Sequence, residues 1–150
     1  MTVYLDYCAS APIDSRVLDV MINIYRENYG NADSRTHIFG AKAKEIVEKA
    51  RKSIAAILDI DSNELIFTSG ATESNNIAIL GLIDYAIETG KKHIITTAIE
   101  HKAVLGPIQF LESKGFDVDY VYPDFSGRID PEDLLSRIRP DTLFVSVMHV

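Results

Sequence analysis

Hydrophobic residues recur along the first part of the chain at the spacing of an amphipathic helix. The apolar positions are Val17, Leu18, Met21, Ile24 and Tyr25. Asp14 or Ser15 can cap the start of this helix, because both side chains accept hydrogen bonds from free backbone N–H groups. Gly30 and Asn31 can end it. We therefore predict a helix between these signals.

A longer apolar stripe predicts a second helix from Ala41 to Leu58. It is preceded by residues 30–40, GNADSRTHIFG, a polar segment bounded by glycines that we interpret as a loop. The other face of the helix carries Glu45 four residues before Lys49 and Glu48 four residues before Lys52. Such pairs are typical of a solvated helix face, not of a binding patch.

The rest of the chain alternates between strand and helix patterns. The expected strands are Leu65–Thr68, His93–Thr97, Asp117–Tyr122 and Thr142–Met148. The expected helices are Glu73–Glu88, Ala103–Lys114 and one that begins at Pro131 after the cap Asp130. Pro107 is tolerable only near the first turn of its helix. This order favours an α/β fold with a mainly parallel sheet flanked by helices.

Composition narrows the classes of protein and of partner. The 150 residues are 47% hydrophobic and carry a net charge of −7, which fits a soluble domain with no general attraction to nucleic acid or anionic membranes. Cys8 is the single cysteine, so we expect no internal disulfide and a reducing, cytoplasmic setting. We expect no signal peptide and no transmembrane helix. The chain stops directly after a strand pattern, and we expect it to be part of a larger protein.

The segment FTSGATESNN, residues 67–76, lies between a strand pattern and a helix pattern. Ligands of α/β proteins collect at such junctions, where the first turn of a helix offers unpaired N–H groups to an anion. Gly70 lets the backbone approach closely, and the Thr72 hydroxyl can donate a hydrogen bond. The segment is neither a P-loop nor a dinucleotide fingerprint. It therefore indicates either a phosphate site or an ordinary capped turn.

The next strand leads into Glu100-His101-Lys102 at a second junction of the same kind. We expect His101 to lie in the same crevice as Thr72. A histidine there can exchange protons near neutral pH or stack on an aromatic cofactor. A purely structural histidine would fit the same pattern.

Several motifs together resemble the cysteine desulfurases, enzymes of the fold type I class V aminotransferase family that use pyridoxal 5′-phosphate. The motifs are YLDYCASAP, YGNADSRTHIFG, ELIFTSGATESNNIAI, KHIITTAIEHKAVL and VSVMHV. They stand in the order of that family and cover the whole chain, but only the first part of such an enzyme. The resemblance implies an N-terminal segment followed by the first part of the cofactor-binding large domain.

The resemblance assigns roles to four residues. Ala71 and Thr72 match the positions that hold the cofactor phosphate, and His101 matches the histidine that stacks on the pyridine ring and is proposed to move protons. Asn31 matches a region near the substrate entrance, although Ala32 stands where the family usually has proline. Cys8 stands where the family commonly has serine or asparagine.

Other parts of the family's machinery have no match in this chain. The cofactor-binding lysine, the aspartate that pairs with the pyridine nitrogen, further phosphate ligands and the nucleophilic cysteine would all lie beyond Val150. Lys91, Lys92 and Lys102 do not fit the lysine motif, and we interpret them as solvated. Cys8 lies far from the position of the nucleophile. His37, His93 and His149 lack metal-ligand spacing, so we expect no metal.

For the complete enzyme, the resemblance implies conversion of L-cysteine to L-alanine, with the sulfur left as a persulfide on an enzyme cysteine. It implies a homodimer and a sulfur-acceptor protein in iron–sulfur cluster assembly, tRNA thiolation or sulfur modification of DNA. The 150-residue chain alone should be inactive. The alternatives are another fold type I enzyme, such as a selenocysteine lyase or an aminotransferase, and a non-catalytic fragment that acts as an interaction module.

Overall fold

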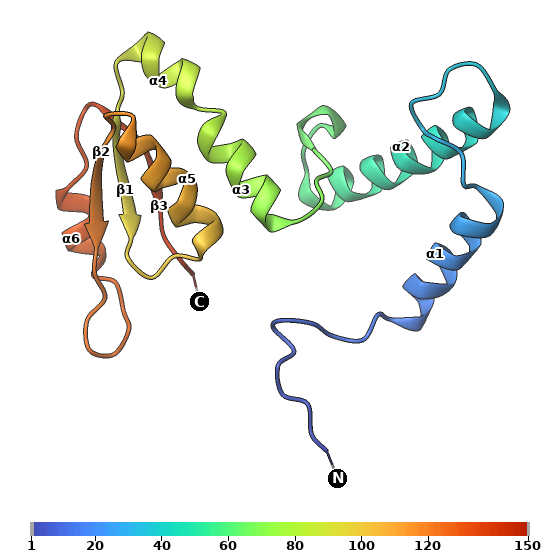
Figure 1. Ribbon diagram of the computed structural model, residues 1–150, viewed down its shortest axis with the longest axis horizontal. Coiled ribbons are helices and arrows are strands. Elements are labelled where there is room, and N and C mark those ends of the chain that lie inside the picture. The colour runs from blue at the N-terminus through green and yellow to red at the C-terminus, as the bar shows by residue number, and fades with distance from the viewer. Residues whose placement is uncertain (1, 150) are drawn as a thin grey trace. The chain divides into compact units, whose positions relative to one another are not determined.

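The computed structural model describes residues 2–149 and divides into two compact units, one ending at Ile66 and the other beginning at Phe67 (Figure 1). The first unit holds α1 (Ser15–Glu27), α2 (Ile38–Leu58) and the short 3-10 helix η1 (Ser62–Glu64). The second unit holds the sheet and the remaining helices. Each unit is described by itself.

Side-chain caps fix where the two long helices of the first unit begin. The Asp14 carboxylate accepts a hydrogen bond from the Arg16 N–H (2.9 Å), as expected for the cap of α1. At α2, the ring Nδ1 of His37 accepts from the Gly40 N–H (3.1 Å), and the helix therefore starts three residues before the expected Ala41. On the charged face of α2, Glu48 pairs with Arg51 (3.4 Å).

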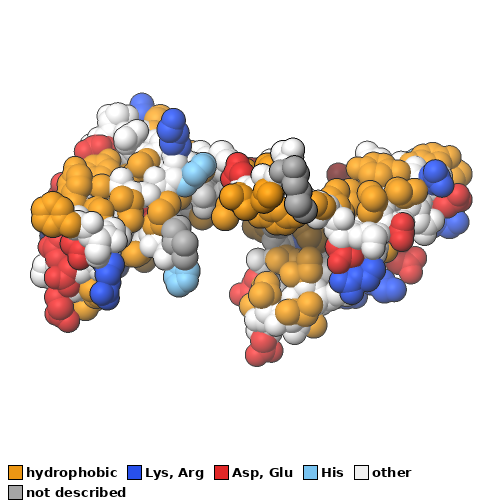
Figure 2. All heavy atoms as spheres, turned by 90° about the horizontal axis from the view of Figure 1, so that it is seen from below, with side chains coloured by type: hydrophobic (Ala, Val, Ile, Leu, Met, Phe, Trp, Pro, Cys, Tyr) orange, Lys and Arg blue, Asp and Glu red, His pale blue; other side chains and the backbone are white. Residues whose placement is uncertain are grey.

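The apolar stripe that predicts α1 is open to solvent. Val17, Leu18 and Tyr25 are exposed by 52%, 41% and 74%, and no residue of α1 is buried. Figure 2 shows hydrophobic side chains over much of the visible surface. Exposed apolar surface of this extent is typical of faces that pack against other polypeptide. Among residues 2–149, no helix is long and apolar enough to cross a membrane.

The second unit is built on a parallel three-stranded sheet with the order β2-β1-β3. Its strands are β1 (His93–Thr97), β2 (Asp117–Val121) and β3 (Thr142–Ser146). Its helices are α3 (Ala71–Leu80), α4 (Ile83–Thr89), α5 (Lys102–Ser113) and α6 (Pro131–Ser136). The α/β class and the parallel sheet are thus confirmed.

The core of this unit lies between the sheet and the helices α3, α4 and α5. Every residue of β1 is buried, and Ile94 packs in one cluster with Ile108 and Leu111 of α5 and Ala86 of α4. Full burial of an isoleucine or leucine side chain contributes roughly 1.5–3 kcal/mol. The central strand is therefore anchored firmly, and so is the start of the turn that leaves its carboxyl end.

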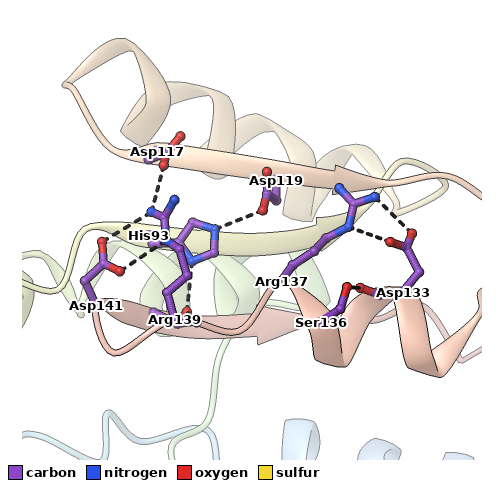
Figure 3. Close-up of polar contacts among 9 residues, drawn as sticks. His93, Asp117, Asp119, Asp133, Ser136, Arg137, Arg139 and Asp141 are labelled. Carbon is purple, nitrogen blue, oxygen red and sulfur yellow. Dashed lines mark hydrogen bonds and ion pairs between the residues drawn. The ribbon is translucent and has the colours of Figure 1, made fainter.

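Polar side chains join the strands at the opposite, amino-terminal end of the sheet (Figure 3). The fully buried His93 ring contacts the Thr142 hydroxyl through Nδ1 (2.8 Å) and the Asp119 carboxylate through Nε2 (3.3 Å). Arg139 pairs with Asp117 (2.7 Å). His93 thus has a structural role that links all three strands, at the end of the sheet opposite the turn that leads to His101.

Two expected elements differ from the structure. The strand Leu65–Thr68 is wrong: residues 65–68 form no strand, and the Leu65 carbonyl accepts a hydrogen bond from the Arg51 guanidinium instead of from a partner strand. The single helix Glu73–Glu88 is divided into α3 and α4. Glycine has a low helix propensity, and Gly81 ends α3 as its C-cap.

Smaller differences concern the ends of elements. β3 ends at Ser146, two residues before the expected Met148. Pro107 is the sixth residue of α5, further into the helix than expected, and its lack of an N–H leaves the Ala103 carbonyl without that helical donor. Pro107 is buried, so its packing against neighbouring side chains offsets part of this loss. The cap Asp130 and Pro131 at the start of α6 are confirmed.

Candidate functional site

The turn before α3 depends on a glycine. Gly70 is the N-cap of α3 and has φ 157° and ψ 179°, a backbone conformation that residues with a Cβ rarely adopt. No heavy atom lies within 4 Å of where its Cβ would be. The space beside the Gly70 backbone is therefore open to a ligand, and the conformation rather than crowding requires glycine.

Glu73 holds this turn from inside the helix. Its Oε2 accepts hydrogen bonds from both the backbone N–H and the hydroxyl of Ser69, each 2.6 Å long. These two bonds lower the pKa of the Glu73 carboxyl below its ordinary value, and the bond from the Ser69 hydroxyl has the larger effect. The carboxylate is thereby turned back onto Ser69 at the edge of the turn.

The first turn of α3 keeps several hydrogen-bond donors free. The first helical bond runs from the Ser74 N–H to the Gly70 carbonyl (3.1 Å), so the N–H groups of Ala71, Thr72 and Glu73 precede it. Within residues 2–149, neither these N–H groups nor the Thr72 hydroxyl has a hydrogen-bond partner. Free N–H groups at the positive end of a helix dipole, with a hydroxyl beside them, fit a phosphate.

His101 is the N-cap of α5, at the carboxyl end of the central strand. Its Nδ1 accepts a hydrogen bond from the Ala103 N–H (3.0 Å). Because Nδ1 must be unprotonated to accept this bond, the proton of the neutral ring lies on Nε2. In the capped arrangement, His101 can donate from Nε2, but it cannot take up a proton at Nδ1 without losing the cap.

Thr72 and His101 line one cavity between α3 and α5, with a volume of about 590 Å³. Such a volume lies within the range of small-molecule sites. Asn76 and Lys102 also line it, and Phe110 and Pro107 supply apolar surface. The structure therefore brings Thr72, an imidazole ring and a cationic side chain together at one cavity. The shared position of Thr72 and His101 is as expected, although no strand precedes α3. Lys102, interpreted from the sequence as solvated, is exposed but also lines the cavity. Ala71 lies at the first position of α3 and does not line the cavity.

Asn31 belongs to the first unit, in the loop before α2. Its Oδ1 accepts a hydrogen bond from the Asp33 N–H (3.0 Å). The loop is tightly closed, because a Cβ on Gly40 would collide with the backbone oxygen of Ser34. The nearby Ser34 hydroxyl contacts Nε2 of His37 (2.9 Å). These contacts explain the order of the loop, and the role of Asn31 at a substrate entrance stays a prediction.

Three polar residues near the cavity were not identified from the sequence. Glu73 follows Ser69 by four residues, a spacing that could have indicated a bond back to the start of the helix. The Asn76 amide donates to the Thr72 carbonyl (2.8 Å), one helical turn earlier. Glu100 bonds Ser146, 46 residues away, and no local signal could have revealed that pair.

The other candidates have simpler surroundings. Cys8 is exposed and has a free thiol. Within residues 2–149, no cluster of three or more His, Cys, Asp or Glu side chains is arranged to hold a metal ion.

Known proteins match this chain over nearly its whole length. The aminotransferase class-V family matches residues 3–150. The cysteine desulfurase IscS of Neisseria meningitidis serogroup C is 49% identical over 148 residues, which cover 99% of this chain and 36% of that protein. The chain therefore spans little more than a third of the length of this relative.

Solved structures agree with these matches. DndA from Streptomyces lividans is 53% identical, with a TM-score of 0.83, over 99% of this chain and 41% of that one. SspA, solved in complex with cysteine, is 42% identical, with a TM-score of 0.88, over 99% of this chain and 42% of that one.

Proposed function

Because the chain belongs to the class-V aminotransferase family, we propose that the complete protein is a pyridoxal 5′-phosphate-dependent cysteine desulfurase. It converts L-cysteine to L-alanine and leaves the sulfur as a persulfide on an enzyme cysteine. The observation that carries this proposal is that Thr72 and His101 line the same cavity. The names of the relatives, and the cysteine complex of one of them, support cysteine as the substrate.

Residues 1–150 form the N-terminal segment and the first part of the cofactor-binding domain. The N–H groups of Ala71 and Thr72 and the Thr72 hydroxyl would bind the cofactor phosphate, because they are free donors at a helix start. The positive charge of Lys102 on the same cavity favours an anion there. Asn31 would lie near the substrate entrance, a role that rests on the resemblance alone.

When bound, pyridoxal phosphate supplies an electron sink that stabilises negative charge on the α-carbon of an amino acid. His101 contributes an aromatic face and a hydrogen-bond donor at Nε2. Proton uptake by its ring at Nδ1 would break the bond to the Ala103 N–H. We therefore expect proton uptake at Nδ1 to require a small movement of the ring away from its cap, whereas Nε2 can donate a hydrogen bond in the capped orientation.

The remaining partners follow from the same proposal. The persulfide passes to a sulfur-acceptor protein, and the IscS name of the relatives favours iron–sulfur cluster assembly. The protein acts as a cytoplasmic homodimer and needs no metal.

The test is to supply the complete protein with pyridoxal phosphate and L-cysteine and to measure alanine and enzyme-bound persulfide. We expect one alanine for each sulfur removed. Parallel reactions with L-selenocysteine, and with L-alanine and a 2-oxo acid, test the lyase and aminotransferase alternatives. Preference for either of these reactions, or no alanine from cysteine, would reject the proposal.

A further inference from the structure

The turn between β1 and α5 is tied to the strands on both sides of β1. On one side, the Ala98 N–H donates to the Val121 carbonyl at the end of β2 (2.9 Å). On the other side, the hydroxyl of Ser146, the last residue of β3, donates to Oε1 of Glu100 (2.8 Å). Since β1 is the central strand, the two bonds hold the turn across the whole carboxyl edge of the sheet.

Glu100 is the residue directly before His101, so its position limits where the histidine can lie. On the helix side, the His101 carbonyl accepts from Val104 (2.9 Å) and Leu105 (3.1 Å), and its ring is held by the Ala103 N–H. On the sheet side, the only side-chain tie of this turn among residues 2–149 is the one from Glu100 to Ser146. Besides the backbone bonds, one hydrogen bond that involves a side chain thus restrains this turn on each side of His101.

Two properties of the hydrogen bond between Glu100 and Ser146 make it suited to restrain the turn before α5. Both residues are partly buried, which reduces competition from water. The acceptor is a carboxylate, and hydrogen bonds to charged groups are shorter and stronger than neutral ones. Within residues 2–149, Glu100 forms no ion pair, so the Ser146 hydroxyl is its side-chain partner.

We propose that Glu100 is a positioning residue, which acts through Ser146 to hold His101 in its capped orientation on the cavity. This inference rests on the proposed function and adds a residue to its site. Glu100 does not line the cavity, so its effect must pass through the backbone it shares with His101. Small displacements of a catalytic group are costly, since a misplacement of about 1 Å can reduce a rate a hundredfold.

The test uses the complete protein with Glu100→Ala, Ser146→Ala and the double variant. Glu100→Gln is the conservative variant, because its amide oxygen can still accept from Ser146. Ser113→Ala is the matched control: this serine also forms a side-chain hydrogen bond (2.7 Å to the Phe110 carbonyl), but at the far end of α5.

The first readout is the ring-nitrogen NMR spectrum of the protein labelled with ¹⁵N-histidine, without cofactor, with His101 assigned by its loss in His101→Asn. We expect the wild type, Glu100→Gln and Ser113→Ala to show His101 as one form with the proton on Nε2. Glu100→Ala and Ser146→Ala should show a mixture of the two neutral ring forms. The spectrum tests the inference whether or not the protein desulfurates cysteine.

The second readout is the split between kcat and KM for L-cysteine. We expect kcat to fall about tenfold in each alanine variant while KM stays within about twofold, because the orientation of a catalytic group is lost. The double variant should fall no further than either single variant. Glu100→Gln should retain most of the rate. Unchanged His101 signals in both alanine variants, or additive losses in the double variant, would overturn the inference. Absence of cysteine turnover in the wild type would instead reject the proposed function.

Discussion

The carboxylate of Glu73 accepts hydrogen bonds from both the N–H and the hydroxyl of Ser69, each 2.6 Å long. One side chain of α3 thereby closes the turn that precedes its own helix. The closure leaves the N–H groups of Ala71 and Thr72 free, since neither is used to hold the turn. The turn is therefore prepared for an anion before any ligand binds.

This contact makes the turn sensitive to acid. The pKa of Glu73 is lowered in the folded state, so its contribution to stability is present above the ordinary pKa of glutamate, about 4.3. The contribution is lost as the pH falls through the lower, folded value. We expect the amide resonance of Ser69 to shift with a midpoint below that ordinary pKa. The shift should be absent in Glu73→Gln and kept in the control Glu88→Gln. A midpoint at or above the ordinary pKa of glutamate would contradict the account.

Thr72→Val should weaken retention of pyridoxal phosphate by the complete protein. The substitution keeps the shape of the side chain but removes a hydroxyl that has no other partner. Loss of a hydrogen bond to a charged group costs about 1.5–3 kcal/mol, or roughly ten- to hundredfold in affinity. Dialysis followed by absorbance of the bound cofactor measures the effect.

Thr89→Val serves as the control for this exchange. The Thr89 hydroxyl also lies on a helix of the second unit, but it donates to the Tyr85 carbonyl (2.6 Å) and does not line the cavity. We expect the control to retain cofactor as the wild type does. Equal retention by Thr72→Val would exclude the hydroxyl as a phosphate ligand.

His101→Asn should separate the cap of α5 from the chemistry of the ring. Asparagine is a favoured N-cap, so the helix should persist while the aromatic face and Nε2 are lost. We expect kcat to fall about 10²- to 10⁴-fold, the usual contribution of a general acid or base. His37→Asn makes the same exchange at the cap of α2 and measures its effect on thermal stability alone. A kcat within about threefold of wild type would remove His101 from the proton-transfer steps.

Local sequence patterns predicted the elements that depend on neighbouring residues. Asp14 and Asp130 are caps as expected, because capping is decided within three residues. The common cavity of Thr72 and His101 was expected from two strand-to-helix junctions, but only His101 follows a strand. The packing of α3 against α5 brings Thr72 to the cavity instead. The roles of both residues toward a cofactor stay predictions.

Features that depend on distant residues were not predictable. Leu65–Thr68 has the composition of a strand, but a strand requires a partner backbone, and the Leu65 carbonyl bonds the Arg51 side chain instead. The bond between Glu100 and Ser146 requires the register of β1 with β3, which includes an irregularity after His93. Sequence spacing contains no information on that register.

Cys8→Ser should leave persulfide formation unchanged in the complete protein. Cys8 is exposed, but exposure alone does not make a thiol a nucleophile, which also requires an environment that favours the thiolate. Cysteine labelled with ³⁵S, followed by peptide mapping, measures where the sulfur is bound. Label on the peptide that contains Cys8 would contradict this prediction.

The central claim is that the start of α3 and His101 form one side of a pyridoxal phosphate site. A crystal structure of the complete protein grown with pyridoxal phosphate tests it most directly. We predict phosphate oxygens about 2.7–3.2 Å from the Thr72 hydroxyl and from the N–H of Ala71 or Thr72, the range of hydrogen bonds. The pyridine ring should lie against the His101 imidazole. A cofactor bound without contact to Thr72 and His101 would contradict the account.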